Sequence, residues 1–310
     1  MTGLSEIAAA GTKVTRVLLD PVPAADRDAT LAELDALAAL CDRDMVRRPY
    51  YAVSPALRDR WNDALPRFGA EPHRLGALML ARLIARSVGR TNRSIPASIV
   101  PEVVEQFGRI LRRVTGRSTR DLRLEDDVYL KDLALCRLEA LPCAVQIIER
   151  GAGIPRRLLV DGGVGQAARL LALAAGNGRA WRPYLEMHLH TPMLRSFSPE
   201  GWRKCYLMVA DILRAEPEWL GILGGSWFYD PAVEEFSPNL AYLRREPLAG
   251  GASFFRRHTT DEDVHNATAT PEPRRQAYLD GRYKPSGWSI VWPRGALLAW
   301  ADKTVSAGAS

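Results

Sequence analysis

The sequence predicts a protein of the α/β or α+β class, in which a helical N-terminal region packs on a C-terminal domain built around a mixed sheet. Before residue 143 the apolar residues recur at helical spacing, and no strand pattern interrupts them. After residue 143, short apolar or alternating runs typical of strands follow one another between helical segments. Seven of the eight tryptophans lie at or beyond Trp181, which indicates a second, thicker core or a ligand cleft in this half.

The chain of 310 residues is long enough for about two domains. Hydrophobic residues make up 47% of it and charged residues 25%, a balance typical of globular rather than disordered proteins. We expect a weakly ordered lead-in over residues 1–25, a mainly helical region over 26–150 and a mixed α/β domain over 151–310. The boundary is expected near Pro142 and the glycines of 151–153.

Helix-start signals place the elements of the N-terminal region. Thr30 and Glu33 have the spacing of a capping box, so a helix is expected to begin at Thr30. Ser54 followed by Pro55 predicts the start of another helix over 54–64. The remaining apolar stripes predict helices over 74–88, 101–115 and 125–140.

The C-terminal half reads as strands and helices in alternation. Helices are expected over 166–175, 199–215 and 272–280. The alternation of Trp288, Ile290 and Trp292 is interpreted as one core-facing side of the last strand. The expected strands are 144–148, 157–160, 184–190, 219–229, 240–245, 252–257 and 286–292.

The chain has a mild positive charge of +6, which permits anionic ligands without requiring them. A helical cluster of arginines is interpreted as a solvated face, so nucleic acid is not an expected partner. The cluster comprises Arg109, Arg112, Arg113, Arg117 and Arg120.

The cysteines and the N-terminus indicate the cellular setting. Cys41, Cys136, Cys143 and Cys205 lie far apart in apolar surroundings, so we expect buried reduced thiols. The first residues lack a basic start followed by an apolar run, and no run of 18 apolar residues predicts a membrane span. A cytoplasmic location without a membrane partner is therefore expected.

The segment Tyr184–His190 carries the most informative polar pattern. In a strand, alternation places Glu186, His188 and His190 on one face, and Leu185, Met187 and Leu189 on the other. Two imidazoles and a carboxylate on one face can bind a divalent metal ion. The same face can instead provide a general base, or it can be an ordinary wet strand face.

Two glycine-rich segments are weaker candidates. Gly163-x-Gly165-x-x-Ala168 fits a relaxed dinucleotide-binding pattern, with Glu186 at about the expected distance, or it is a turn between a strand and a helix. The segment 221–231 contains Ser226 between a glycine pair and aromatic residues, but not in the pattern of a nucleophile elbow.

The order of the strand 184–190, the helix 199–215, the strand 219–229 and the following Asn239 and Tyr242 resembles the later half of GCN5-related N-acyltransferases (GNAT). In this family one strand carries the general base and separates from its neighbour to admit the acyl-CoA thioester. The resemblance implies a GNAT-like C-terminal domain with Glu186 or His188 as base.

It further implies Tyr242 as general acid, with Tyr278 as the competing match, and Arg195 and Gly201 near the CoA pyrophosphate at a helix N-terminus.

The sequence therefore favours an acyltransferase-like enzyme that uses acyl-CoA and a small amine-bearing metabolite. One alternative is a metal-dependent hydrolase or oxygenase with Glu186, His188 and His190 as ligands of a divalent ion. Another is a non-catalytic ligand-binding or interaction protein. The oligomeric state and the identity of the substrate are left open.

Overall fold

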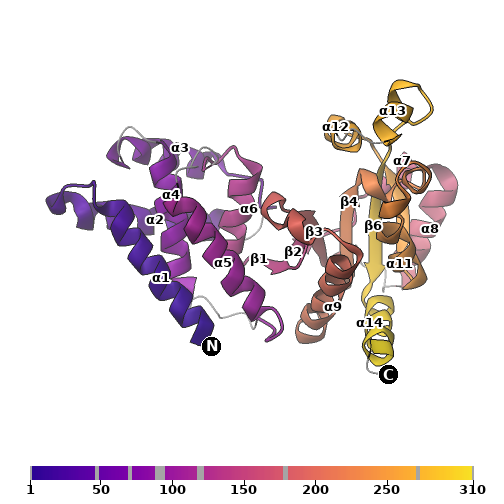
Figure 1. Ribbon diagram of the computed structural model, residues 1–310, viewed down its shortest axis with the longest axis horizontal. Helices are drawn as coiled ribbons and strands as arrows, with labels where there is room; N and C mark the ends of the chain where they lie inside the picture. The colour runs from indigo at the N-terminus through magenta and orange to yellow at the C-terminus, as the bar shows by residue number, and fades with distance from the viewer. Residues whose placement is uncertain are drawn as a thin grey trace. The chain divides into compact units, whose positions relative to one another are not determined.

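A computed structural model describes residues 2–45, 49–68, 72–87, 95–116, 122–176, 181–269 and 273–308. The chain divides into two compact units (Figure 1). Unit 1 comprises Met1–Glu149 and His190–Leu194, and unit 2 comprises Arg150–Leu189 and Arg195–Ser310. The fold is mixed α/β, as expected. None of the described helices is long and apolar enough to cross a bilayer.

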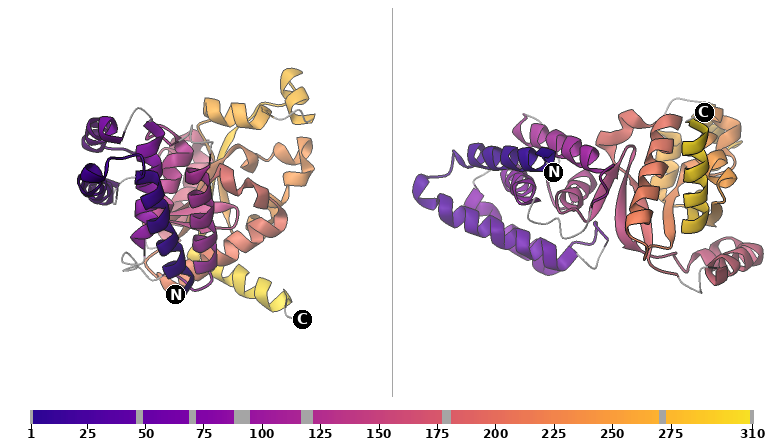
Figure 2. Two further views of the ribbon diagram at one scale, coloured as in Figure 1. Left: turned by 60° about the vertical axis from the view of Figure 1, so that its left-hand side comes forward. Right: turned by 90° about the horizontal axis from the view of Figure 1, so that it is seen from below.

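Unit 1 is a helical assembly with a short hairpin at its end. Helix α4 lies at its centre and contacts α1, α2, α5 and α6 (Figures 1 and 2). The predicted cap at Ser54 is confirmed, because its Oγ accepts a hydrogen bond from Leu57 N at 3.0 Å. The helices are α1 (Thr2–Leu19), α2 (Arg27–Met45), α3 (Pro55–Ala64), α4 (Pro72–Ala85), α5 (Val100–Thr115) and α6 (Asp127–Cys136), with short 3₁₀ helices at Ala24–Asp26 and Leu65–Phe68.

Two expectations for the first residues are wrong. The expected lead-in is largely α1, which packs on α4 because Gly11 lets the backbones approach closely. A Cβ at Gly11 would lie 2.8 Å from Ala85 N. Helix α2 begins before Thr30, whose hydroxyl donates to Asp26 O, while Glu33 accepts from Arg60 at 2.8 Å instead of closing a capping box.

A strand also precedes residue 143, contrary to expectation. Helix α6 ends at Cys136, and Leu138 has a positive φ of 59°. The following β1 (Ala140–Cys143) pairs antiparallel with the start of β2 (Gln146–Ala152), within which the chain leaves unit 1. The apolar residues of β1 extended the helical pattern of 125–140, which is why the sequence did not separate them.

Of the arginines of α5, Arg112 is exposed as expected, but Arg109 and Arg113 do not belong to a solvated face. Arg109 pairs with Glu105 at 2.8 Å, and Arg113 pairs with the buried Asp132. Their side chains are 16% and 27% exposed, respectively, which is low for arginines that were expected to face solvent. Arg117 and Arg120 lie outside the described residues.

Unit 2 is built on four strands in the order β3-β4-β6-β5. Strands β3 and β4 are parallel, whereas β6 is antiparallel to both β4 and β5. The strands are β3 (Tyr184–Leu189), β4 (Gly221–Ser226), β5 (Ser253–Arg257) and β6 (Gly287–Pro293). The helices are α7 (Leu158–Asp161), α8 (Gly163–Gly176), α9 (Pro199–Ala215), α10 (Val233–Phe236), α11 (Tyr242–Ala249), α12 (Asp261–Thr268), α13 (Pro273–Leu279) and α14 (Arg294–Gly308), with 3₁₀ helices at Trp227–Tyr229 and Pro238–Leu240.

The two faces of this sheet have different coverings. On one face, Tyr184, Leu223 and Val291 form a core with Leu158 of α7 and Leu170 of α8. On the other face, an aromatic cluster joins the sheet to α9 and α14. It contains Tyr206, Trp292 and Trp300, whose ring centroids are 5.1–5.9 Å apart. The tryptophans of this half thus belong largely to a core, as their alternation in the last strand predicts.

Two expected strands of unit 2 are helical instead. Residues 157–160 fall in α7, and residues 242–245 begin α11. Both segments are short and apolar or mixed, and periodicity alone does not separate a short buried strand from one helical turn. The predicted strands at 252–257 and 286–292 and the helix at 199–215 are confirmed within one or two residues.

Candidate functional site

Strand β3 places Glu186 and His188 on the face of the sheet that α7 and α8 cover. The register pairs Glu186 with Leu223, which lies in that core together with Tyr184. Glu186 Oε2 and His188 Nε2 are 3.9 Å apart, and their side chains are 33% and 15% exposed. The prediction that these two residues share a face is therefore confirmed, and both side chains are accessible.

His190 does not join them, contrary to the sequence interpretation. Strand β3 ends at Leu189, and His190 belongs to unit 1, where it is fully buried. Its Nε2 lies 3.0 Å from Asp132 Oδ1. The structure thus brings together two of the three expected metal ligands, and the third uses its Nε2 in a buried hydrogen bond. Sequence reasoning missed this because Asp132 is 58 residues away in the chain.

Strands β3 and β4 separate at their carboxyl ends. Their pairing ends at Met187 and Gly224, although β3 continues to Leu189 and β4 continues to Ser226. Gly225, the first residue of β4 beyond this point, is exposed. On the face of the sheet that carries Glu186 and Leu223, Gly225 is the next residue of β4, and His188 is the next residue of β3. The pairing of the two parallel strands therefore stops before the strands themselves end, next to the two polar side chains. Ligands of parallel sheets commonly bind at such carboxyl ends.

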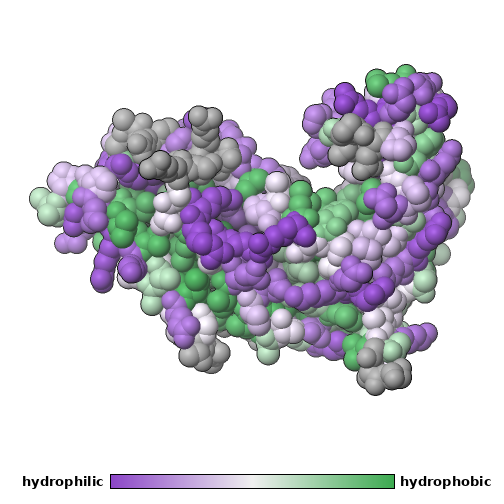
Figure 3. Space-filling model, in the orientation of Figure 1, coloured by the Kyte–Doolittle hydropathy of each residue, from purple (hydrophilic) through white to green (hydrophobic). Residues whose placement is uncertain are grey.

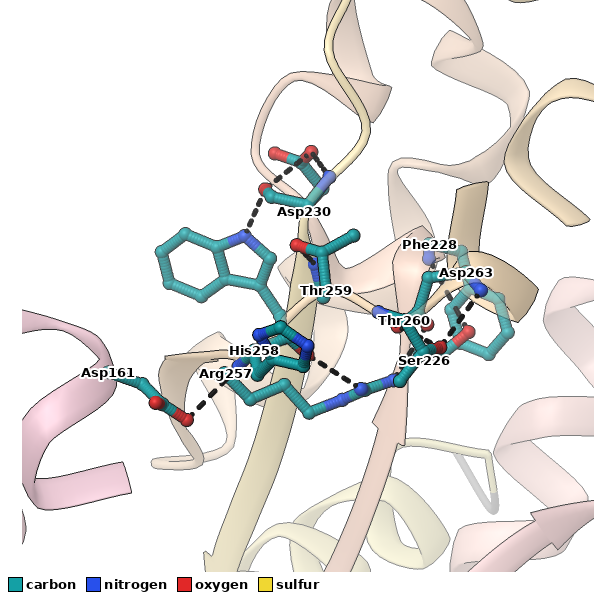
Figure 4. A network of polar contacts seen from close by, with 12 residues as sticks. Asp161, Ser226, Phe228, Asp230, Arg257, His258, Thr259, Thr260 and Asp263 are labelled. Carbon is teal, nitrogen blue, oxygen red and sulfur yellow. Dashed lines mark hydrogen bonds and ion pairs between the residues drawn. The ribbon is translucent and has the colours of Figure 1, made fainter. Parts of the chain in front are cut away.

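Arg257 of β5 lies over Gly225, at the same end of β4. An added Cβ at Gly225 would lie 3.0 Å from Arg257 Nε, so the glycine makes room for the guanidinium group. Arg257 donates to Asp263 Oδ1 at 2.7 Å and to His258 O at 3.0 Å (Figure 4). Its Nε is buried and has no hydrogen-bond partner among the described residues. Arg257 is not recognisable as a site residue from the sequence, because only the order of the strands brings it to β4.

The loops around Arg257 are fixed by further hydrogen bonds. Thr260 and Asp263 form a capping box at the start of α12, and His258 N donates to Asp161 Oδ2 at 3.0 Å (Figure 4). Asp230 accepts two hydrogen bonds from Ser286, and Ser226 Oγ accepts from Phe228 N. Ser226 therefore ends β4 as a cap, which agrees with the absence of a nucleophile-elbow pattern.

Tyr242 begins α11, in the layer on the opposite face of the sheet. The next turn of α11 places Arg244 over the rings of Phe254 and Trp288, residues of that face. Burial, and secondarily the nearby Glu200 carboxylate, raise the pKa of Tyr242 to about 12. Tyr242 therefore keeps its proton at neutral pH, as a general acid requires.

The N-terminus of α9 is already capped. Ser198 Oγ accepts a hydrogen bond from Gly201 N at 3.1 Å, and Glu200 lies in the first turn. The backbone hydrogen bond at Glu200 and the Ser198 hydroxyl lower the pKa of the Glu200 carboxyl group, which is therefore charged. Arg195 is exposed in the preceding 3₁₀ helix (Thr191–Ser196). A pyrophosphate here would have Arg195 nearby but would also meet the Glu200 carboxylate.

The dinucleotide-binding interpretation does not fit the structure. The glycines of 162–165 join two helices, α7 and α8, whereas the pattern requires a strand before the turn. Gly162 has a local reason instead, because an added Cβ would lie 2.2 Å from the Gln166 carboxamide. Gln166 is thereby held against the main chain of β5.

The described residues of unit 2 thus place a carboxylate and an imidazole near the carboxyl end of a parallel strand pair, with an arginine on the same face of the sheet. This set can accept a proton and can position a polar or anionic group, which suits transfer chemistry on a small ligand. No protein-family model, no curated protein and no solved structure matches the chain.

Proposed function

We propose that unit 2 is an acyl-CoA-dependent N-acyltransferase that acts on a small amine. The observation that carries this proposal is the separation of β3 and β4 after Met187 and Gly224, directly beside Glu186 and His188. In the acyltransferase family that the sequence resembles, the acyl thioester enters between two such strands. Strands β6 and β5 are antiparallel, so this end of the parallel pair β3–β4 is where two neighbouring strands present their carboxyl ends together.

The reaction would transfer the acyl group from sulfur to nitrogen. The amine nitrogen attacks the thioester carbonyl, and Glu186 or His188 takes the proton that the nitrogen loses. The C–S bond then breaks, and the leaving thiolate takes the proton of the Tyr242 hydroxyl, which approaches from the opposite face of the sheet. The tyrosinate regains a proton from solvent and the protonated base releases one, so the products are an amide and free CoA and both residues return to their starting states. Tyr242 follows β4 in the chain order that the resemblance implies, whereas Tyr278 lies in α13 after β5 and is 39% exposed.

Two measurements test this proposal. The first is stabilisation of the purified chain by acetyl-CoA, NADPH or S-adenosylmethionine, since a ligand at a hundred times its Kd stabilises by about 2.7 kcal/mol. We expect acetyl-CoA alone to raise the Tm. The second is release of free thiol from acetyl-CoA in the presence of a panel of small amines.

Three substitutions assign the roles of the residues. Glu186→Gln, His188→Asn and Tyr242→Phe remove the two candidate bases and the acid, and loss of a general acid or base lowers kcat by about 10²–10⁴-fold. Tyr278→Phe is the matched control and should change kcat less than twofold, because this tyrosine is exposed on another helix. A chain that binds NADPH instead, or that loses activity only with Tyr278→Phe, contradicts the proposal.

A further inference from the structure

Helix α8 is apolar on both of its faces. Its inner face carries Gln166, Leu170 and Ala174, which are buried against the sheet. Its outer face carries Val164, Gly165, Ala168, Leu171, Ala172 and Ala175, which are exposed, and the exposed Arg169 lies at the edge of this face. A surface helix of a globular protein ordinarily turns charged and polar residues to solvent, and a helix that is apolar all round is ordinarily covered. Arg169 is therefore the one charged residue that α8 exposes, and the rest of its exposed surface is apolar.

The bulky residues of this face are among the most exposed apolar side chains of the described chain. Val164 is 87% exposed and Leu171 is 52% exposed, and Val160 at the end of α7 is 75% exposed. These three lie on α7 and α8, two short helices that contact each other, whereas most of the other exposed large apolar residues are scattered along the chain; we therefore treat the three as one patch. Apolar surface is visible in Figure 3 at the edge of unit 2 where Figure 1 shows α8.

Arginines border the patch. Arg156, Arg157 and Arg169 are exposed, and Asp161 is the one acidic residue between Arg150 and Glu186 in the sequence. Over residues 154–176 the net charge is therefore three minus one, or +2. Asp161 is itself held by Arg157 at 3.2 Å and by His258 N, so it does not offset Arg156 or Arg169 locally. The whole chain has the same sign, +6.

We propose that α7 and the outer face of α8 form a peripheral docking surface for an anionic lipid bilayer. Val160, Val164 and Leu171 would enter the interface between headgroups and acyl chains, while the bordering arginines contact anionic headgroups. Exposed apolar side chains flanked by arginines are the combination that interfacial segments use. The contact would be peripheral, made by side chains of α7 and α8 at the membrane surface.

Charge favours this occupant over a second copy of the chain. A twofold contact through α8 would bring Arg169, near the middle of the helix, close to its own copy, and like charges repel. An anionic surface instead attracts every arginine around the patch. An anionic bilayer therefore removes the apolar face from water and also provides anionic headgroups for the bordering arginines.

Vesicle flotation tests the proposal with the full chain. The vesicles contain either phosphatidylcholine alone or equal parts of phosphatidylcholine and phosphatidylglycerol. We expect the chain to float only with the anionic vesicles, and increasing salt should release it because surface charges are screened. Val164→Glu and Leu171→Glu should each weaken binding about tenfold or more, and Arg156→Gln about fivefold.

Leu279→Glu is the matched control. Leu279 is 67% exposed on α13, away from the patch, so this variant adds the same charge at a similarly exposed apolar site and should bind vesicles like the wild type. All four positions are exposed, and an unchanged Tm verifies that the variants fold. Equal binding to neutral vesicles, equal loss with Leu279→Glu, or no binding at all overturns the proposal. So does a dimer in light scattering that Val164→Glu converts to monomer, because a second copy then covers the patch.

Discussion

At the scale of single residues, His190 shows how burial selects a protonation state. Its Nε2 faces Asp132, which Arg113 also contacts, so Nε2 carries the proton and donates it to the carboxylate. Burial, and secondarily the charges of Lys131 and Arg113, lower the pKa of His190 to about 3. The imidazole is therefore neutral at physiological pH, and its Nδ1 has no hydrogen-bond partner among the described residues. This arrangement is structural and supplies no accessible metal ligand.

The lowered pKa predicts how stability depends on pH. Between pH 6.5 and about 3 the unfolded chain binds a proton at this histidine and the folded chain does not. The contribution of the neutral His190 to the free energy of unfolding is therefore complete above pH 6.5. It declines as the pH falls, by about 1.4 kcal/mol per pH unit. Urea unfolding should therefore show that the free energy of unfolding falls between pH 7 and pH 5 by about 2 kcal/mol less in His190→Asn than in the wild type.

His265→Gln is the control for this experiment, because His265 is exposed near the end of α12. It should leave the pH dependence unchanged. If His190→Asn and the wild type decline in parallel, His190 is protonated in the folded chain and the buried neutral imidazole is refuted.

At the scale of elements, the sequence predicts the features that depend on contacts within a few residues of the chain. It does not predict the features that depend on contacts between distant segments. Ser54 and Ser198 begin helices through bonds to amides three residues ahead, and the alternation of β3 follows from strand geometry. Whether 157–160 becomes a strand or α7 depends instead on the position of Gln166 and β5. The approach of Arg257 to Gly225 depends on β6 lying between their strands.

Gln166 attaches α8 to the sheet edge, which leads to a stability prediction. Its amide group donates to Arg256 O and Leu158 O, both at 2.8 Å, and accepts from Arg256 N at 2.7 Å. Gln166→Leu removes all three bonds and leaves buried main-chain groups unsatisfied, so we expect a loss of about 3 kcal/mol in urea unfolding. Gln276→Leu, at an exposed position of α13, should cost less than about 0.5 kcal/mol. Similar losses for both variants would show that Gln166 does not attach α8 to β5.

The N-terminus of α9 gives a second prediction at this scale, which rests on the proposed CoA site. Glu200 places a negative charge in the first turn, where the helix dipole would favour a pyrophosphate. Glu200→Gln should therefore tighten acetyl-CoA binding about two- to fivefold at low ionic strength, measured by calorimetry. Glu262→Gln, in the first turn of α12, is the control. Unchanged affinity in Glu200→Gln would place the pyrophosphate elsewhere while leaving acyl transfer itself to be judged by thiol release.

At the scale of the whole molecule, the two units are not two continuous stretches of chain. Unit 1 takes His190–Leu194 from within the sequence of unit 2. Composition and strand patterns locate a change of structure near residue 150, but they contain no information about a short segment that returns to the first unit. His190 and Met193, both fully buried, are the residues through which that segment enters the core. Their long sequence separation from α6 explains why strand alternation alone placed His190 on one face with Glu186 and His188.

This topology predicts that a fragment ending at residue 149 is incomplete. Without the segment 190–194, Asp132 loses its imidazole partner, and the volume of the Met193 side chain is empty or collapsed. Loss of a buried methionine side chain alone costs about 2–5 kcal/mol. Hydrogen exchange of α5 and α6 should therefore be faster in fragment 1–149 than in the full chain.

In the full chain, the double variant His190→Ala and Met193→Ala should accelerate exchange in the same helices. Leu194→Ala, at a 43% exposed position of the same segment, should leave it unchanged. Equal protection of α6 in the fragment and in the full chain would mean that residues 1–149 form a complete core and that the returning segment contributes nothing to it.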